Sequence, residues 1–248
     1  MIFITGDIHG EPKRFSTNSF QEQKEMTKKD YMIILGDFGL VWDYRGESEY
    51  EMYWLDWLEA KPFTTLFVDG NHENHDRLDA MPVDQWHGGT IHRIRPTVLH
   101  LMRGQVYEIE GRTFFTFGGA SSHDHPDGLL EPDDPRVKEW SRDPYKVFRV
   151  NKRSWWDREL PSEKEMEEGR NNLAKAGWKV DYVLTHCAST GIAKHIDRGF
   201  EDRDILTDYL QEIRQKLTYD TWFCGHYHVD TRIGPEDVIL YEQIVQLK

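Results

Sequence analysis

Short apolar runs that end in Gly-Asp, Gly-Asn or His are the feature that most constrains the fold of this chain. Each run is only four or five residues long and is bounded by turn-forming residues. Continuous apolar runs of this length are typical of strands buried on both faces, as in the parallel sheet of an α/β protein. They predict strands over 2–5, 31–35, 65–68, 182–185 and 221–224, and weaker patterns predict further strands over 97–102, 106–109, 112–117 and 238–245.

Helical patterns lie between these strands. Ser48 with Glu51, and Ser162 with Glu165, have the spacing of a capping box, in which the two side chains satisfy the first free N–H groups of a helix. A third segment, 203–217, carries apolar residues at helical spacing. Strands alternating with helices predict an α/β fold.

Composition and charge exclude several classes of protein. No apolar run approaches the ~20 residues that a membrane span requires, and the start of the chain lacks a signal-peptide pattern. The formal net charge of −13 makes nucleic acid an unlikely partner unless a local positive centre attracts it. Two cysteines cannot form a disulfide framework, so we expect a cytoplasmic protein.

The segment 121–156 differs from the rest of the chain. It is rich in Pro, Asp, Arg and Trp and has weak periodicity. We expect a single domain over residues 1–248, with this segment as an irregular excursion that forms one wall of a substrate cleft. His123 and His125 either line that cleft or belong to a polar loop.

Polar residues follow five of the predicted strands at the point where each strand ends. The carboxyl ends of the strands in an α/β sheet share one edge, and ligands bind at that edge. Asp7-x-His9 and His226-x-His228 also have a spacing that lets both side chains face the same way. The residues expected to converge there are Asp7, His9, Asp37, Asn71, His186, His226 and His228.

Such a cluster of carboxylates, an amide and imidazoles is too polar for a protein core unless it binds metal. Mixed oxygen and nitrogen ligands suit divalent zinc, iron or manganese. Seven ligands exceed the need of one tetrahedral zinc and suit two ions that share a carboxylate. Glycines beside the ligands, such as Gly6 and Gly36, are expected to permit the sharp turns that lead out of the strands. His75, His87, His92, His100 and His195 lack such a motif and are expected to have structural roles.

The order and spacing of five motifs resemble the calcineurin-like metallophosphoesterase superfamily. The motifs are GDIHG at 6–10, GDFG at 36–39, GNHE at 70–73, TH at 185–186 and GHYH at 225–228. The resemblance implies two mixed β-sheets packed as a sandwich and flanked by helices, in a four-layer fold. It also implies that Asp7, His9, Asp37 and His228 hold one ion. Asp37, Asn71, His186 and His226 would hold the other, with Asp37 shared.

The implied activity is hydrolysis of a phosphomonoester or phosphodiester by attack of a water that bridges two divalent ions. His72, which follows Asn71, matches the residue that assists the leaving oxygen. The substrate would be a small phosphorylated molecule. Alternatives are a Ser/Thr-type protein phosphatase, a dinucleoside polyphosphate hydrolase, or a scaffold that binds metal without catalysis.

The chain departs from the protein-phosphatase branch at the positions that bind phosphate. That branch carries GDxxDRG, whereas residues 36–43 read GDFGLVWD, and Val68-Asp69 stand where an arginine is common. Arg45, Arg77 or Arg153 could supply the missing positive charge. The sequence leaves the substrate, the metals bound and the oligomeric state open.

Overall fold

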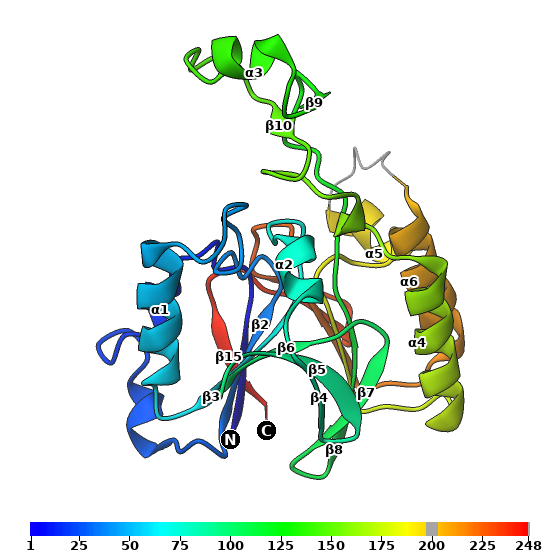
Figure 1. The fold of residues 1–248 in the computed structure, drawn as a ribbon. Helices are drawn as coiled ribbons and strands as arrows, with labels where there is room; N and C mark the ends of the chain where they lie inside the picture. The colour runs from blue at the N-terminus through cyan, green and yellow to red at the C-terminus, as the bar shows by residue number, and fades with distance from the viewer. Residues whose placement is uncertain (197–202, 248) are drawn as a thin grey trace.

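The computed structural model describes residues 1–196 and 203–247, which form a two-sheet sandwich with helices on both outer faces (Figure 1). In this described part, the first sheet has seven strands and the second has six. Each sheet has a parallel centre and antiparallel pairs at both edges, so both are mixed. The α/β sandwich expected from the motifs is therefore confirmed.

The first sheet holds the N-terminal half of the site. Its order is β15 (Ile244–Leu247), β1 (Ile2–Thr5), β2 (Tyr31–Leu35), β3 (Thr64–Val68), β6 (Val98–Leu101), β5 (Gly89–Arg95) and β4 (Val83–Trp86). The helical segments of this half are η1 (Pro12–Phe15), η2 (Gln21–Glu25), α1 (Glu49–Glu59) and α2 (His75–Asp79). Every residue of β1, β2 and β3 is buried, as the apolar runs predict.

The second sheet holds the C-terminal half. Its order is β13 (Thr231–Ile233), β14 (Asp237–Ile239), β12 (Thr221–Cys224), β11 (Tyr182–Thr185), β8 (Arg112–Phe117) and β7 (Gln105–Ile109). The helical segments are η3 (Asp157–Glu159), α4 (Glu163–Lys175), α5 (Thr190–Ile196) and α6 (Ile205–Lys216). The capping boxes at Ser48 and Ser162 are both formed.

Three apolar layers hold the sandwich together. One lies between the sheets and includes Ile33, Leu66 and Phe114, each fully buried. A second packs the first sheet against α1, and a third packs the second sheet against α4 and α6. The layer between the sheets fixes them relative to each other, and so it fixes the edge that both contribute to the site.

The strand predicted over 238–245 is wrong as a single element. β14 ends at Ile239 in the second sheet, and β15 begins at Ile244 in the first. The Asp230 carboxylate accepts hydrogen bonds from the backbone N–H groups of Tyr241, Glu242 and Gln243, at 2.8 to 3.2 Å. These bonds satisfy donors that a continuous strand would have given to a neighbour, so the chain turns there and crosses between sheets. The sequence patterns did not predict β4 and β5. β4 is largely exposed, and β5 intersperses half-buried with buried residues, so neither carries a continuous apolar run.

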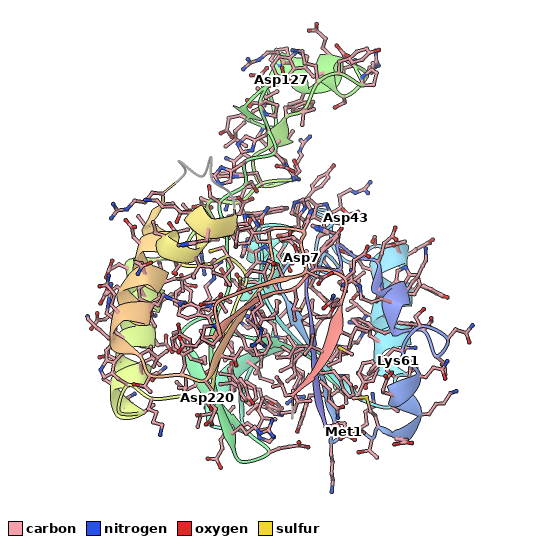
Figure 2. All side chains as sticks on the ribbon, turned by 180° about the vertical axis from the view of Figure 1, so that it is seen from behind. Met1, Asp7, Asp43, Lys61, Asp127 and Asp220 are labelled. Atoms are coloured by element: carbon pink, nitrogen blue, oxygen red, sulfur yellow. The ribbon has the colours of Figure 1, made fainter. Side chains whose placement is uncertain are left out.

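Residues of the segment 121–156 form an arm that projects from the body (Figure 1). It contains β9 (Leu129–Leu130), α3 (Pro135–Trp140) and β10 (Arg149–Val150), and β9 pairs with β10. Asp127 marks the arm and Asp7 the body below it in Figure 2. Among the described residues, no helix has the length and apolar character needed to cross a membrane.

Candidate metal centre

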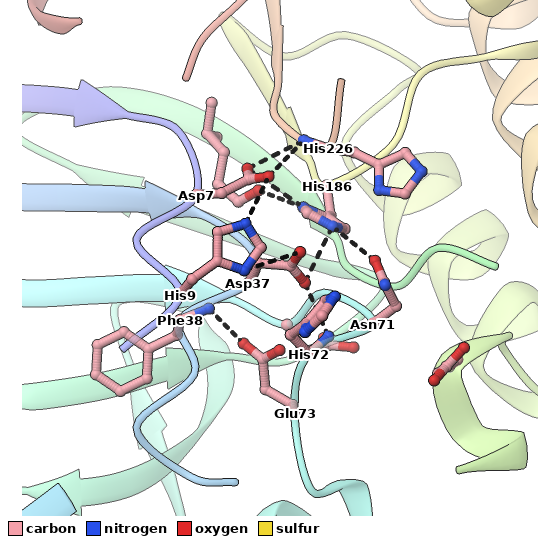
Figure 3. Close-up of polar contacts among 12 residues, drawn as sticks. Asp7, His9, Asp37, Phe38, Asn71, His72, Glu73, His186 and His226 are labelled. Atoms are coloured by element: carbon pink, nitrogen blue, oxygen red, sulfur yellow. Dashed lines mark hydrogen bonds and ion pairs between the residues drawn. The ribbon is translucent and has the colours of Figure 1, made fainter. Parts of the chain in front are cut away.

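The strand ends of both sheets meet at one edge, beneath the arm. Asp7 and Asp37 follow β1 and β2, Asn71 follows β3, and His186 and His226 follow β11 and β12. Figure 3 shows these side chains converging from separate strands. The convergence follows from topology, because parallel neighbours place their carboxyl ends at the same edge.

Four side chains form a group that could hold a metal ion. One ligand atom from each of Asp7, His9, Asp37 and His228 lies within 4.8 Å of all the others. The Nε2 atoms of His9 and His228 are 2.9 Å apart, and His228 Nε2 is 3.3 Å from Asp7 Oδ2. His9 Nδ1 lies 3.7 Å from Asp37 Oδ2.

A second group lies on the other side of Asp37. His186 Nε2 is 3.3 Å from Asp37 Oδ1 and 3.2 Å from Asn71 Oδ1. The His226 ring packs edge-on against His186, with 5.0 Å between centroids, and its backbone N–H donates to both Asp7 oxygens, at 3.0 and 3.2 Å. The two oxygens of Asp37 therefore face different groups, which is the placement that a shared carboxylate needs.

Burial shows why this cluster suits cations. The side chains of Asp7 and His186 are fully buried, and that of Asp37 is only 3% exposed. Carboxylates in such a place require compensating positive charge. Without metal, that charge falls on His186: burial lowers the pKa of His186, but Asp37 and Asp7 outweigh it and raise the pKa to about 10. Burial, together with neighbouring His186, lowers the pKa of His226 to about 4. The donor set thus fits divalent ions.

The backbone is strained at these residues. His9, Asp37, His226 and His228 have φ angles of 46°, 43°, 69° and 50°, in the left-handed region that non-glycine residues rarely adopt. Strain of this kind persists only where the surrounding structure holds it, and it concentrates at functional sites. The sharp turns expected of the glycines are therefore made partly by the predicted ligands themselves.

The glycines of the motifs serve two different purposes. Gly36 has a φ of 93°, as expected for a turn, and an added Cβ there would also overlap the His186 ring. The turn expected at Gly6 is wrong in this respect: Gly6 lacks a positive φ, and an added Cβ would overlap the Leu240 backbone. Gly70 and Gly225 instead permit close approach, since an added Cβ at Gly70 would overlap the Asp37 side chain and backbone, and one at Gly225 would overlap the Asp7 carboxylate.

His72 lies at the open side of the cluster. Its backbone N–H donates to Asp37 Oδ1 at 2.8 Å, and its ring stacks on Trp42 with 5.5 Å between centroids. The His9 ring is 5.0 Å away, edge-on. Burial lowers the pKa of His72, against the opposing effect of Asp37.

The sequence reasoning missed three residues of the arm that contact this site. Ser122 Oγ accepts from the Asn71 amide Nδ2 at 3.1 Å, which turns Asn71 Oδ1 toward His186. Arg149 Nη2 is 3.3 Å from His72 Nε2, and Asp124 Oδ2 is 4.0 Å from the same nitrogen. They stand outside the strand-end motifs, so no local pattern marks them.

Among the remaining histidines, His75, His92 and His100 form a buried network beneath the site. His100 Nε2 lies 3.1 Å from Asp69 Oδ1, and the ring nitrogens of His92 and His100 are 3.0 Å apart. Arg103 donates to Asp69 Oδ2 at 2.5 and 2.8 Å. Asp69 immediately precedes Gly70, so this network supports the loop that carries Asn71. His125 Nδ1 lies 3.8 Å from Asp124, and His123 contributes to lowering the pKa of His226.

Comparisons with known proteins point the same way. The model of the calcineurin-like phosphoesterase family matches residues 1–230. Lariat debranching enzyme A of Xenopus laevis is 25% identical over 92% of this chain and 42% of its own length. Lariat debranching enzymes of Danio rerio and Schizosaccharomyces pombe are 23% and 24% identical, over 92% and 82% of this chain and 40% and 44% of their own lengths.

This chain thus spans about two-fifths of the length of these relatives. The family match covers the described edge of both sheets, where every strand-end motif is found. The chain belongs to the calcineurin-like phosphoesterase family.

Proposed function

We propose that this chain is a metal-dependent phosphodiesterase. Calcineurin-like phosphoesterases hydrolyse phosphoester bonds with a dinuclear divalent metal centre. The observation that carries the proposal is the meeting of two polar groups at Asp37, whose two oxygens face His9 and His186 at 3.7 and 3.3 Å.

Each group would hold one ion. Asp7, His9, Asp37 and His228 would bind the first, and Asp37, Asn71, His186 and His226 the second. A pair of divalent ions supplies a nucleophilic water at neutral pH and neutralises charge on the phosphoryl oxygens. The mixed oxygen and nitrogen ligands suit manganese, iron and zinc alike.

The chain itself would provide the leaving-group proton through His72. Its backbone bond to Asp37 and its stacking on Trp42 fix the ring beside the cluster without making it part of either group. Because burial lowers the pKa of His72, its protonated form is a stronger acid toward an alkoxide leaving group.

The curated relatives favour a phosphodiester over a phosphomonoester. The arginines that are absent from the positions used by the protein-phosphatase branch argue only against that branch. The curated relatives described above are lariat debranching enzymes, and opening a lariat cleaves a phosphodiester at a branch. These relatives weaken the expectation that nucleic acid is not a partner, and a branched oligonucleotide becomes the first substrate to test.

The scaffold alternative is less well supported. A protein that only binds metal needs no imidazole beside the ligands, yet His72 is held there by three separate contacts. The phosphatase alternative predicts faster turnover of 4-nitrophenyl phosphate than of the diesters in the substrate test below, and the dinucleoside polyphosphate alternative stays a separate prediction.

The test is a substrate panel with metal analysis. Protein loaded with manganese, iron or zinc is assayed on a branched 2′,5′-linked oligonucleotide, its linear counterpart, bis(4-nitrophenyl) phosphate and 4-nitrophenyl phosphate. We expect about two ions per chain, diester turnover above monoester turnover, and loss of activity with a chelator. Asp37→Asn should lose metal and activity, whereas Asp56→Asn, an exposed carboxylate on α1, should lose neither. One ion or none in folded, metal-supplemented protein would refute the dinuclear assignment.

The arm is proposed to form one wall of the substrate cleft. Ser122, Asp124 and Arg149 bring it to the edge of the site. Replacement of residues 132–146 by a short Gly/Ser linker removes α3 and leaves Ser122, Asp124 and Arg149 in place. It should lower kcat/KM for the preferred oligonucleotide and spare turnover of bis(4-nitrophenyl) phosphate. An unchanged kcat/KM for the oligonucleotide in the shortened protein would show that specificity does not depend on the arm.

A further inference from the structure

We propose that Arg149 binds a non-bridging oxygen of the substrate phosphate, and that Asp124 occupies its guanidinium until the substrate displaces it. The inference rests on the phosphoesterase function proposed above and names the residue that supplies the missing positive charge. It concerns the neck of the arm, where residues 25 positions apart in sequence meet beside His72.

The arginines favoured by sequence are committed elsewhere. Arg77 Nη1 donates to both Glu51 oxygens, at 2.9 and 3.1 Å, and fixes the start of α1. Arg45 is 73% exposed and pairs with its near neighbour Asp43. The Arg153 guanidinium lies over the Tyr44 ring, 5.4 Å from its centroid.

Arg149 is instead at the site. Its Nη2 lies 3.3 Å from His72 Nε2, and the His72 ring packs against His9, a member of the first metal group. A phosphate placed between the metal groups and His72 would therefore have the guanidinium at its flank. The same contact places Arg149 beside the nitrogen that His72 would turn toward a leaving group.

The guanidinium is held in place rather than free in solvent. The Arg149 side chain is 13% exposed, and its guanidinium lies 5.8 Å from the Trp42 ring centroid. Its Nη1 donates to the Ser154 carbonyl at 3.2 Å. A guanidinium positioned in this way loses little freedom when it binds an anion, and its planar fork matches two oxygens of a phosphate as well as those of a carboxylate.

Asp124 is the partner that substrate can replace. Arg149 Nε donates to Asp124 Oδ1 at 3.1 Å and Nη2 to Oδ2, so the carboxylate occupies the two donors that a phosphodiester would use. The Asp124 side chain is 52% exposed, so it can return to water when displaced. The exchange of one anion for another leaves the charge around Arg149 unchanged, which keeps the cost of the exchange low.

The kinetic test uses bis(4-nitrophenyl) phosphate and manganese-loaded protein. Loss of a charged hydrogen-bonded contact should raise KM about 10- to 100-fold in Arg149→Ala, with a smaller effect on kcat. Arg149→Lys should recover part of the affinity, and Asp124→Asn should lower KM a few-fold because the competing anion is gone. Arg136→Ala is the matched control, since Arg136 pairs with Asp134 on the same arm in the same two-donor geometry. An unchanged KM in Arg149→Ala, or a rise in Arg153→Ala instead, would overturn the assignment.

A second measurement does not depend on turnover. In zinc-loaded, ¹⁵N-arginine-labelled protein, the Nε–H signal lost in Arg149→Lys identifies Arg149. Inorganic phosphate should shift that signal, and at lower concentration in Asp124→Asn than in the wild type. A signal that phosphate leaves unmoved would overturn the proposal. If the wild type hydrolyses neither bis(4-nitrophenyl) phosphate nor 4-nitrophenyl phosphate, the proposed function is refuted. If the wild type is active and KM is unchanged in Arg149→Ala, only this inference is refuted.

Discussion

Substitution of Arg103 by Met should destabilise the protein strongly, because it leaves a buried carboxylate without its cation. The Asp69 side chain is 2% exposed and that of Arg103 is 4% exposed. Arg103 gives Asp69 Oδ2 two hydrogen bonds, at 2.5 and 2.8 Å, and it also donates to the Arg158 carbonyl at 2.8 Å. Methionine preserves most of the side-chain volume and removes every one of these donors.

The size of the effect follows from burial. Removal of one partner of a buried ion pair typically costs about 3–5 kcal/mol, since the remaining charge stays out of water. For a chain of this size, each kcal/mol corresponds to about 2–4 °C in Tm, which predicts a fall of about 6–20 °C. Arg170→Met is the matched control: Arg170 also contacts several carboxylates, but its partners Glu163, Glu167 and Glu212 are 76%, 59% and 33% exposed and so keep contact with water. Exposed pairs contribute at most about 1 kcal/mol.

Thermal and urea unfolding at several pH values provide the assay. Burial would raise the pKa of Asp69, but Arg103 and His100 hold it well below its usual range. The stability that this depressed pKa contributes is present at neutral pH and is lost as the pH falls through the acid range. In Arg103→Met the guanidinium no longer opposes burial, so the pKa of Asp69 rises and the buried carboxyl takes up a proton more readily as the pH falls. The loss should therefore be largest near pH 7 and smaller near pH 4, and Asp69→Asn combined with Arg103→Met should recover part of it. A loss below about 1 kcal/mol at pH 7 would refute the reasoning.

Two further predictions concern the site, and a third concerns the pH dependence of stability. His72→Ala should keep both metals and lower kcat about 10²–10⁴-fold for an alkyl ester, and by less for a nitrophenyl ester, whose leaving group needs little protonation. Steady-state kinetics and metal analysis check this. An equal loss of kcat for both esters, together with loss of metal, would make His72 a ligand or a structural residue. Gly70→Ala should abolish tight metal binding, because the added Cβ would overlap Asp37. A metal affinity equal to that of the wild type, measured by titration calorimetry, would contradict this. Burial raises the pKa of Glu159 to about 8, so the folded chain binds that proton more tightly and its stability falls between about pH 4 and 8. Glu159→Gln should therefore raise Tm at pH 8 and barely at pH 4, and equal shifts at both would exclude this cause.

Much of the fold and of the candidate site is predictable from short stretches of sequence. A buried strand needs only a local apolar run, and the rule that parallel strands end at one edge brings Asp7, Asp37 and Asn71 together on the first sheet. His186 follows a strand of the second sheet, so its approach to them depends on how the two sheets pack. The helix starts at Ser48 and Ser162 are equally local, because a cap acts within one turn.

Other features depended on contacts between distant residues. The strand predicted over 238–245 divides between two sheets because Asp230 binds the backbone between β14 and β15. Gly70 and Gly225 are required by side chains that approach them from other strands, rather than by their own φ angles.

The residues of the candidate metal centre can be recognised from the sequence, because ligand type and strand-end position are both local properties. Which cation lies beside that cluster depends instead on how distant parts of the chain pack together. Arg45, Arg77, Arg149 and Arg153 look alike in sequence, and their roles follow from the carboxylate or ring that packing places beside each. An arginine side chain is long and pairs with whatever anion the fold brings near it, so its partner is set by long-range packing and not by its neighbours in the chain.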